Sequence, residues 1–479
     1  MPESSGVLFP TITFGVFFTV VMAGHWLLMG RRRAWRVFML AASYVFYGWW
    51  DYRFLLLLMV STVLDFTVAQ AMVHTTVEGR RRGYLVLSIV GNLALLGFFK
   101  YYDFFVTELV NAASDVGVSL PLRPLNVILP VGISFFVFKT LSYTIDVYRR
   151  QLTPTSSLLE YALFVGFWPE LVAGPIVRGS VFLPQLHSED RRPLEPARAY
   201  GLILGGLFKK VVIADLVATQ LVDPVFANPG GHTGLETLVG VYGYAVQIFC
   251  DFSGYSDIAT GCALLLGFRF PRNFDRPYAA VSIQDFWRRW HITLSSWLRD
   301  YLYIGLGGNR KGRLRTKVNL LLTMLLGGLW HGAGWTFVVW GALHGLGLAV
   351  ERTWQERREA AGRVPSPRPL VRVARVVLTF HFVCLGWVFF RATDFGRAFD
   401  LLGRLAHGWG EAHTFTGGAL LALVVGLAIQ YVPRDALPRL ARAFAAWPAL
   451  AQGVAAAAVV MAIDTLGSQG VAPFIYFQF

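Results

Sequence analysis

Residues 325–345 read LLGGLWHGAGWTFVVWGALHG, an apolar run that contains two histidines and six glycines. About 20 consecutive apolar residues are enough for a helix to cross a bilayer. An ionisable group at the centre of a membrane costs about 2.5 kcal/mol or more, so such groups face the interior of a helix bundle and mark function. The run therefore predicts both a membrane fold and a site inside it.

The composition of the whole chain agrees with this interpretation. Of the 479 residues, 55% are hydrophobic and 15% are charged, and the mean hydropathy is +0.51. Soluble proteins usually carry about 25% charged residues. Other apolar runs occupy residues 9–30, 34–50, 54–73, 84–99, 125–143, 238–249, 318–331 and 371–390. We predict an all-α polytopic membrane protein, with 1–479 as a single membrane-embedded domain and about 10–12 transmembrane helices plus re-entrant or interfacial helices.

Basic residues indicate the orientation of the chain. The first apolar run has its arginines behind it and not in front, so we expect a retained helix with the N-terminus outside, not a signal peptide. Basic residues of membrane proteins gather in cytoplasmic loops. With a tight turn at Trp50–Asp51, the clusters at 31–33, 80–82, 149–150, 310–317 and 351–375 can all lie inside. The net charge of +14 thus indicates membrane orientation, and we expect no nucleic-acid partner.

Two conspicuous segments do not have the pattern of a straight span. In residues 282–302, aromatic and leucine side chains recur at three- and four-residue spacing among charged ones, which predicts an amphipathic helix at the interface. Residues 164–179 contain two prolines and three glycines. A broken or re-entrant piece covered by protein is expected there.

Three histidines are candidate catalytic residues. His331 lies between Trp330 and the flexible Gly332-Ala333-Gly334, and His344 follows thirteen residues later. On one straight helix these two rings would lie roughly 140° apart, so they share a site only if the chain breaks between them. Neutral imidazole is the side chain best suited to accept a proton near pH 7. A satisfied packing role remains the alternative for each ring, and an interfacial role remains open for His291.

Two carboxylates, Asp251 and Asp257, lie six residues apart in apolar surroundings. They could bind a cation or orient a histidine, or they could be hydrogen-bonded links between helices. The three cysteines show no metal-binding spacing, and we expect no metal. Because nucleophile-elbow and phosphate-loop motifs are also missing, direct acyl transfer with a histidine base is a natural candidate chemistry.

Ordered blocks between Ala42 and Glu351 resemble the membrane-bound O-acyltransferase family, and within it the branch of the bacterial alginate O-acetylation membrane protein. The blocks are ASYVFYGWWDYRFLLLL, LPVGISFFVFKTLSYTIDVYR, ELVAGPIVR, QIFCDFSGYSDIATG, NFDRPYAAVSIQDFWRRWHITLSSWLRDYLYIGLGGNRKG and LGGLWHGAGWTFVVWGALHG. The resemblance implies a helical bundle in which a cytoplasmic and an extracellular cavity meet at a waist. It also implies that His331 is catalytic and that His291 is the second functional histidine, with His344, Trp330, Asp251 and Asp257 as possible supporting residues.

The sequence departs from the family pattern at three positions. Gly305 stands where relatives usually have proline, and Lys139 and Glu170 each stand where a glutamine is common. None of these departures falls on a histidine, so the reaction class is unaffected. They bear on the local shape of the cytoplasmic side and on substrate detail.

The resemblance implies transfer of acetyl groups from a cytoplasmic thioester donor, acetyl-CoA, across the plasma (inner) membrane to an extracellular or cell-wall polysaccharide. We expect acetyl-CoA as a co-substrate with no bound cofactor, a periplasmic or extracellular acetyltransferase as partner, and contact with membrane lipids. Because the charged donor cannot cross the bilayer, it should dock on the basic cytoplasmic side, at Arg288, Arg289, Arg310 and Lys311.

Two alternatives remain open at this point. Within the family, the chain could move D-alanine from a carrier protein to teichoic acid. In a different class, it could be a transporter or flippase of an acyl donor or lipid-linked sugar, with Asp251, Asp257 and His331 as a proton relay. Cleavage of the thioester would separate the enzyme from the transporter.

Overall fold

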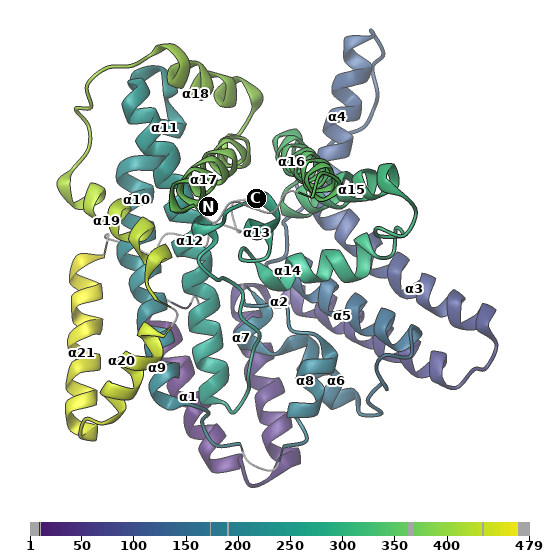
Figure 1. Cartoon of the computed structure of the whole chain (residues 1–479). Coiled ribbons are helices and arrows are strands. Elements are labelled where there is room, and N and C mark those ends of the chain that lie inside the picture. Colours follow the sequence, from purple (N-terminus) through teal and green to yellow (C-terminus); the bar gives the residue numbers. More distant parts are fainter. Residues whose placement is uncertain are drawn as a thin grey trace. The chain divides into compact units, whose positions relative to one another are not determined.

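A computed structural model describes residues 9, 11–172, 174–188, 191–362, 368–433 and 435–467. Within these residues all regular secondary structure is helical, which confirms the predicted all-α class (Figure 1). The chain forms two compact units. The first comprises residues 1–196 and 262–271, and the second comprises residues 197–261 and 272–479. The single-domain boundary 1–479 stays a prediction.

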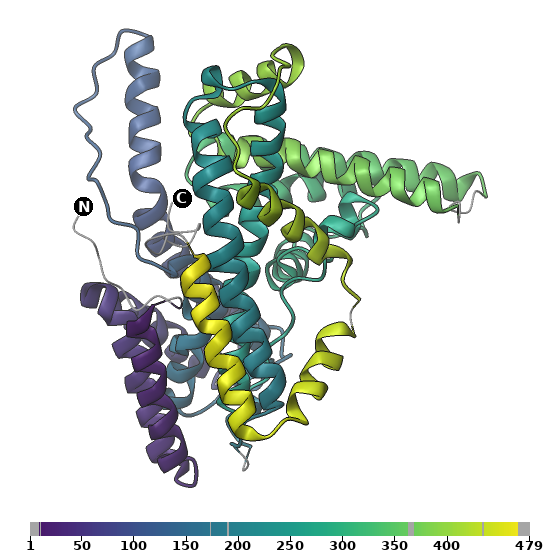
Figure 2. The same cartoon turned by 90° about the vertical axis from the view of Figure 1, so that its left-hand side faces the viewer.

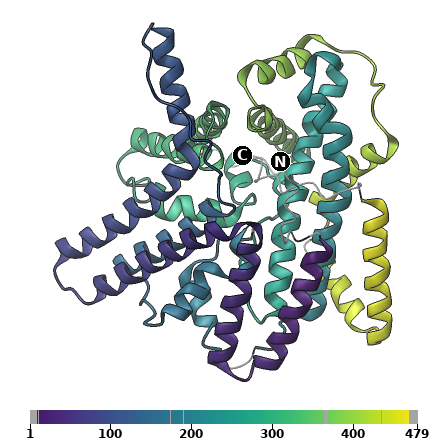
Figure 3. The same ribbon diagram turned by 180° about the vertical axis from the view of Figure 1, so that it is seen from behind.

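The helices of the first unit are α1 (Ile12–Leu28), α2 (Arg32–Val73), α3 (Glu78–Leu96), the π-helical turn η1 (Gly97–Tyr101), α4 (Tyr102–Asp115), α5 (Ile133–Tyr148), α6 (Leu158–Gly166), α7 (Trp168–Leu171) and α8 (Gly179–Gln185). In this unit α2, α3 and α5 pack against one another, as Figure 3 shows for the purple and blue helices.

The second unit begins with α9 (Pro196–Leu207), the π-helical turn η2 (Phe208–Ala214), α10 (Asp215–Val217), the π-helical turn η3 (Ala218–Val222), α11 (Asp223–Ala227), the 3-10 turn η4 (Pro229–Gly231) and most of α12 (Gly234–Leu265). It continues with η5 (Pro277–Ala279), α13 (Ile283–Trp287), α14 (Ile292–Trp297), η6 (Leu298–Tyr303), α15 (Arg313–His331), α16 (Trp335–Ala360) and α17 (Pro369–Arg391). It ends with α18 (Phe395–His407), α19 (Gly417–Ala428), η7 (Ile429–Tyr431), α20 (Ala436–Ala445) and α21 (Ala449–Leu466), the last of which packs on η2 (Figure 2).

Among the described residues, four helical segments are long and apolar enough to cross a membrane. They are Arg32–Val73, Glu78–Asp115, Pro369–Arg391 and Ala449–Leu466, and two shorter apolar helices accompany them. Many of their large hydrophobic side chains are exposed on the protein surface, where only lipid offers them an apolar environment. The fold is that of an all-α membrane protein, while the count of 10–12 spans stays a prediction.

A backbone break inside α2 replaces the tight turn that was expected at Trp50–Asp51. The helical ladder runs from Arg32 to Val73, but Asp51 has extended dihedrals of φ −161° and ψ 110°. Its carboxylate accepts the backbone N–H of Arg53 at 2.9 Å, as an N-cap residue does for a new helix. The sequence therefore located the break correctly.

Two predicted elements have different bounds. The run 125–143 becomes helical only at Ile133, because Pro130 and Gly132, whose φ is +74°, stop the helix from extending further towards the N-terminus. The amphipathic helix expected over 282–302 is interrupted at His291, which has a left-handed φ of +40° between α13 and α14. The broken segment expected at 164–179 is confirmed by the sequence of short helices α6, α7 and α8.

A buried polar cluster joins three helices of the first unit. The carboxylate of Asp65 on α2 accepts hydrogen bonds from Ser88 Oγ at 2.5 Å and Asn92 Nδ2 at 2.7 Å, both on α3. Thr140 Oγ1 on α5 donates to Asn92 Oδ1 at 3.2 Å. Buried polar groups are costly unless they are hydrogen-bonded, so these contacts specify how α2, α3 and α5 face one another.

The two family departures Lys139 and Glu170 form a single ion pair. Lys139 on α5 is 1% exposed, and its Nζ lies 2.6 Å from Glu170 Oε1 on α7. The same ammonium donates to the Phe164 carbonyl at 2.6 Å and lies 4.8 Å from the centre of the Phe164 ring. The pair thus ties the broken segment α6–α7 to the long helix α5.

We expect Lys139→Gln to destabilise the protein by about 3–5 kcal/mol, because it leaves the Glu170 carboxylate buried without a counter-charge. The double variant Lys139→Gln/Glu170→Gln removes both charges and should be more stable than either single variant. Thermal unfolding of the four proteins in detergent measures the coupling. Additive effects of the two substitutions would contradict the pairing.

Candidate active site

The histidine-containing run folds into a helical hairpin of the second unit. Helix α15 ends at His331, the chain is non-helical at Gly332-Ala333-Gly334, and α16 begins at Trp335. The two helices lie side by side in Figure 1 and make extensive contacts. The break expected from the glycines is therefore present.

Glycines allow the two helices of the hairpin to approach at backbone distance. A Cβ atom at Gly328 would lie 2.3 Å from the carbonyl oxygen of Phe337, and one at Gly341 would lie 2.4 Å from that of Met324. A Cβ at Gly345 would meet the Cα of Leu321 at 2.9 Å. Small residues at a helix interface permit this kind of packing in membranes. The spacing of these glycines thus sets where His331 and His344 lie.

His331 and His344 contact the same indole. The ring centre of Trp340 lies 5.1 Å from that of His331 and 5.0 Å from that of His344. Phe390 of α17 and Trp330 complete the aromatic surroundings of His331, at 5.3 and 5.0 Å. His331 is 3% exposed. Burial of this kind keeps an imidazole uncharged, and an uncharged imidazole can accept a proton.

The tautomer of His344 follows from its hydrogen bond. Trp287 Nε1 donates to His344 Nδ1 at 3.2 Å, and an indole nitrogen can only donate. The proton of the neutral His344 ring is therefore on Nε2. Trp287 also packs against Trp340, with 5.7 Å between ring centres, so α13 contributes directly to the histidine surroundings.

His291 occupies the break between α13 and α14 and is completely buried. Burial lowers the pKa of this imidazole to about 3, so the ring is neutral at physiological pH. Its Nδ1 lies 3.1 Å from Asn273 Oδ1. The Trp330 indole lies 6.2 Å from the His291 ring and 5.0 Å from that of His331. Two indoles, Trp330 and Trp340, thus connect the three predicted histidines into one cluster.

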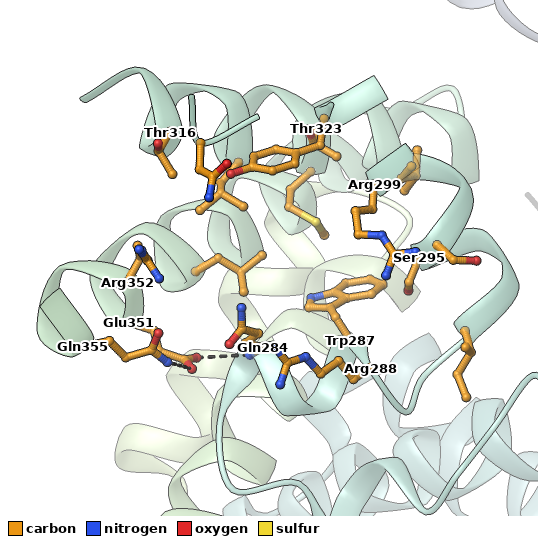
Figure 4. A pocket seen from close by; sticks show the side chains of 18 residues that line it. Gln284, Trp287, Arg288, Ser295, Arg299, Thr316, Thr323, Glu351, Arg352 and Gln355 are labelled. Carbon is orange, nitrogen blue, oxygen red and sulfur yellow. Dashed lines mark hydrogen bonds between the residues drawn. The ribbon is translucent and has the colours of Figure 1, made fainter. Parts of the chain in front are cut away.

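A cavity of about 450 Å³ lies beside this cluster (Figure 4). Trp287, the hydrogen-bond partner of His344, forms part of its wall. Three arginines, Arg288, Arg299 and Arg352, also line it, and Figure 4 shows them together with Glu351. His331 is not among the residues that line this cavity.

The predicted docking residues are distributed unequally round this cavity. Arg288 lines it, whereas Arg289 is paired with Asp285, its Nε lying 2.8 Å from Oδ1. Arg310 and Lys311 are not part of the lining, although the neighbouring Asn309 is. Arg299 and Arg352, which sequence analysis did not predict as docking residues, also line the cavity. Both are paired as Arg289 is, with Arg299 Nε 2.7 Å from Asp300 Oδ1 and Arg352 Nε 3.0 Å from Glu356 Oε1.

Comparison with known proteins identifies the family. The model of the MBOAT, membrane-bound O-acyltransferase family matches residues 46–385. The chain belongs to the membrane-bound O-acyltransferase family. His291, His331 and His344 all lie within the matched segment, as do Trp287 and Asn273.

Individual relatives agree with this assignment. The chain is 43% identical over 389 residues to a protein of Pseudomonas aeruginosa named "Probable alginate O-acetylase AlgI", over 81% of this chain and 72% of that protein. It is 39% identical to the "Peptidoglycan O-acetyltransferase" of Helicobacter pylori, over 77% of this chain and 73% of that protein. It is 32% identical to the "Teichoic acid D-alanyltransferase" of Streptococcus thermophilus, over 54% of this chain and 68% of that protein. The chain is an O-acyltransferase similar to alginate and peptidoglycan O-acetyltransferases.

The carboxylates Asp251 and Asp257 of this O-acyltransferase pair with lysines. Lys210 Nζ lies 2.6 Å from Asp251 Oδ1 and 2.8 Å from Asp215 Oδ1, and Lys209 Nζ lies 2.6 Å from Asp257 Oδ2. These contacts link the π-helical turn η2 to α12, which supports the structural alternative for both aspartates. Two adjacent lysines inside the apolar run 201–217 were the signal that could have revealed them.

We expect Gly341→Ala to destabilise the O-acyltransferase by about 1–3 kcal/mol, because the added methyl group forces α15 and α16 apart. Acyl transfer should fall as well, since His331 and His344 lie on the two separated helices. Gly83→Ala on α3 is the matched control, because its Cβ would meet nothing within 4 Å. Unfolding temperature and transfer rate of both variants are the measurements, and equal behaviour would refute the close packing.

Proposed function

We propose that this O-acyltransferase moves an acetyl group from acetyl-CoA, or a related thioester on the cytoplasmic side, to a hydroxyl group for O-acetylation of an extracellular or cell-wall polysaccharide. His331 is the general base. The observation that carries the proposal is the cluster of buried histidines, which Trp330 and Trp340 connect beside an arginine-lined cavity. The relatives named as O-acetylases support acetyl as the transferred group.

The chemistry requires one proton transfer in each direction. The neutral imidazole of His331 takes the proton of the accepting hydroxyl as its oxygen attacks the thioester carbonyl. A carbon–oxygen bond forms, the carbon–sulfur bond breaks, and the imidazolium returns the proton to the departing thiolate. Base catalysis of this kind contributes about 10²–10⁴-fold. A low-dielectric, aromatic environment strengthens the electrostatic interactions on which the transition state depends.

Access to His331 is part of the proposal. Trp287 forms part of the cavity wall, and the Trp340 indole contacts both Trp287 and the His331 ring, at 5.7 and 5.1 Å between ring centres. The acyl-bearing arm of the donor therefore reaches His331 when an aromatic side chain of this wall rotates. Conformational steps of this kind are common in enzymes that exclude water from the reacting groups.

In this proposal the donor binds in the cavity. Its volume of about 450 Å³ lies in the range of small-molecule sites. The guanidinium group of Arg288 matches the phosphates of a coenzyme A-type donor, because arginine binds phosphate oxygens with two parallel N–H groups. Arg299 and Arg352 line the same cavity, where they pair with Asp300 and Glu356. Arg310 and Lys311 add positive charge on the neighbouring turn.

The proposed orientation follows from the charges. We place the chain in a bacterial plasma membrane as a multi-pass protein, with the basic clusters inside and the N-terminus outside. An acetyltransferase on the outer side then receives the acetyl group and passes it to polysaccharide. Lipids surround the exposed apolar helices.

We expect His331→Ala to leave a folded, membrane-inserted protein that transfers acetyl at least about 10²-fold more slowly, because the base is lost. His407→Ala, the same change at an exposed histidine of α18, is the matched control. Proteoliposomes supplied with acetyl-CoA, and in parallel with a D-alanyl carrier protein, report thiol release. Full acetyl transfer by His331→Ala would refute the assignment of His331 as the general base. If the wild-type protein were active with the D-alanyl carrier protein and not with acetyl-CoA, the function would be D-alanyl transfer.

We expect Arg288→Gln to raise the KM for acetyl-CoA about tenfold with little change in kcat, because a charge-assisted hydrogen bond to phosphate contributes about 1.5–3 kcal/mol. Arg357→Gln is the control, since Arg357 is exposed on α16 and does not line the cavity. Initial rates over a range of donor concentrations separate the two parameters. An unchanged KM would exclude this cavity as the donor site.

A further inference from the structure

One amide in the second unit accepts three hydrogen bonds around His291. Asn273 Oδ1 lies 3.1 Å from His291 Nδ1, 3.3 Å from the backbone nitrogen of Thr293 and 2.9 Å from Thr293 Oγ1. On its other side, Asn273 Nδ2 donates to Ser256 Oγ on α12 at 3.1 Å. All of this lies in buried surroundings, with Asn273 itself buried.

The donors decide which end of the amide faces the imidazole. A backbone N–H can only donate, so the atom that faces Thr293 N is the carbonyl oxygen of the Asn273 side chain. The same oxygen faces His291 Nδ1 and cannot donate to it. His291 Nδ1 must therefore carry a proton, and in the neutral ring the lone pair is on Nε2.

Backbone hydrogen bonds hold the segment that contains Asn273 against the segment that contains His291. Ile292 N donates to the Asn273 carbonyl at 2.8 Å, and Asp275 N donates to the Arg289 carbonyl at 2.9 Å. His291 adopts its left-handed conformation between these two contacts. A non-glycine residue in this conformation is strained and persists where its surroundings over-determine it, as they often do at functional sites.

We propose that Asn273 is a positioning residue that fixes His291 in the Nδ1–H tautomer and so makes Nε2 a hydrogen-bond acceptor. His291 then accepts a hydrogen bond from a substrate O–H or S–H group, the acceptor hydroxyl or the thiol product, and does not donate to the thioester carbonyl. The assignment rests on the proposed function for the role of His291, but the tautomer itself does not depend on that function.

The tautomer can be read directly from the ¹⁵N chemical shifts of histidine side chains. We would label the full chain with ¹⁵N-histidine in lipid bilayers and assign the His291 signals by difference from His291→Gln. The wild type should show a protonated Nδ1 and an unprotonated Nε2. The reverse pattern in the wild type would overturn the proposal, whatever the activity of the protein.

Three variants separate positioning from a general structural role. Asn273→Leu removes the acceptor, and we expect a changed or mixed tautomer and about 10²-fold slower transfer, because an acid–base group in the wrong tautomer is ineffective. Asn273→Asp keeps an acceptor oxygen and should keep the Nδ1–H tautomer. Ser256→Ala removes the other hydrogen bond of the amide and should leave the tautomer and the rate close to those of the wild type.

The outcomes distinguish this inference from the proposed function. If Asn273→Leu does not fold, the tautomer of the wild type and of Asn273→Asp still decides the inference. Loss of the Nδ1–H tautomer in Asn273→Asp would contradict it, and so would an unchanged tautomer in a folded Asn273→Leu. A confirmed tautomer together with full activity of His291→Gln would instead refute the catalytic role of His291 while leaving the positioning intact.

Discussion

Close backbone contact between α15 and α16 is the constraint on which the site depends. Gly328, Gly341 and Gly345 leave no room for even a methyl group between the two helices. With the helices held at this distance, the end of α15 and the middle of α16 bring both His331 and His344 into contact with Trp340. A larger distance between α15 and α16 would move His331 away from Trp340 and His344, because His331 lies on α15 and the other two residues lie on α16.

Two buried lysines among the described residues each have a carboxylate partner on another helical element. Lys139 joins α5 to α7, and Lys210 joins η2 to α12 through Asp251. His291 and His344 stay neutral instead. Burial lowers the pKa of both imidazoles to about 3, and the hydrogen bond from Trp287 to His344 and the one between His291 and Asn273 determine which nitrogen is protonated. The first arrangement builds the scaffold, and the second leaves a proton acceptor inside it.

The sequence predicted the fold class and the position of the break in α2, which was expected as a tight turn, because apolar runs and the charges within them are local signals. It also singled out the three histidines, whose roles stay a prediction. The start of α5 was missed because the apolar run continues through Pro130 and Gly132. The backbone conformation of these two residues, and not the hydropathy of the run, determines where the helix begins. Asn273 was missed for a different reason. It lies eighteen positions before His291, and a lone asparagine shows its partner only in three dimensions. The cavity was beyond sequence analysis as well, since α13 to α16 each contribute part of its wall.

The pair Lys139–Glu170 also has an evolutionary consequence. If the ancestral residues were two neutral glutamines, either replacement alone would leave a buried charge without a counter-charge. A lineage can then acquire the pair only if both changes occur nearly together or if other residues first make the single change tolerable. The two positions therefore form an epistatic unit. Homologues with both charges or with neither should therefore far outnumber those with one.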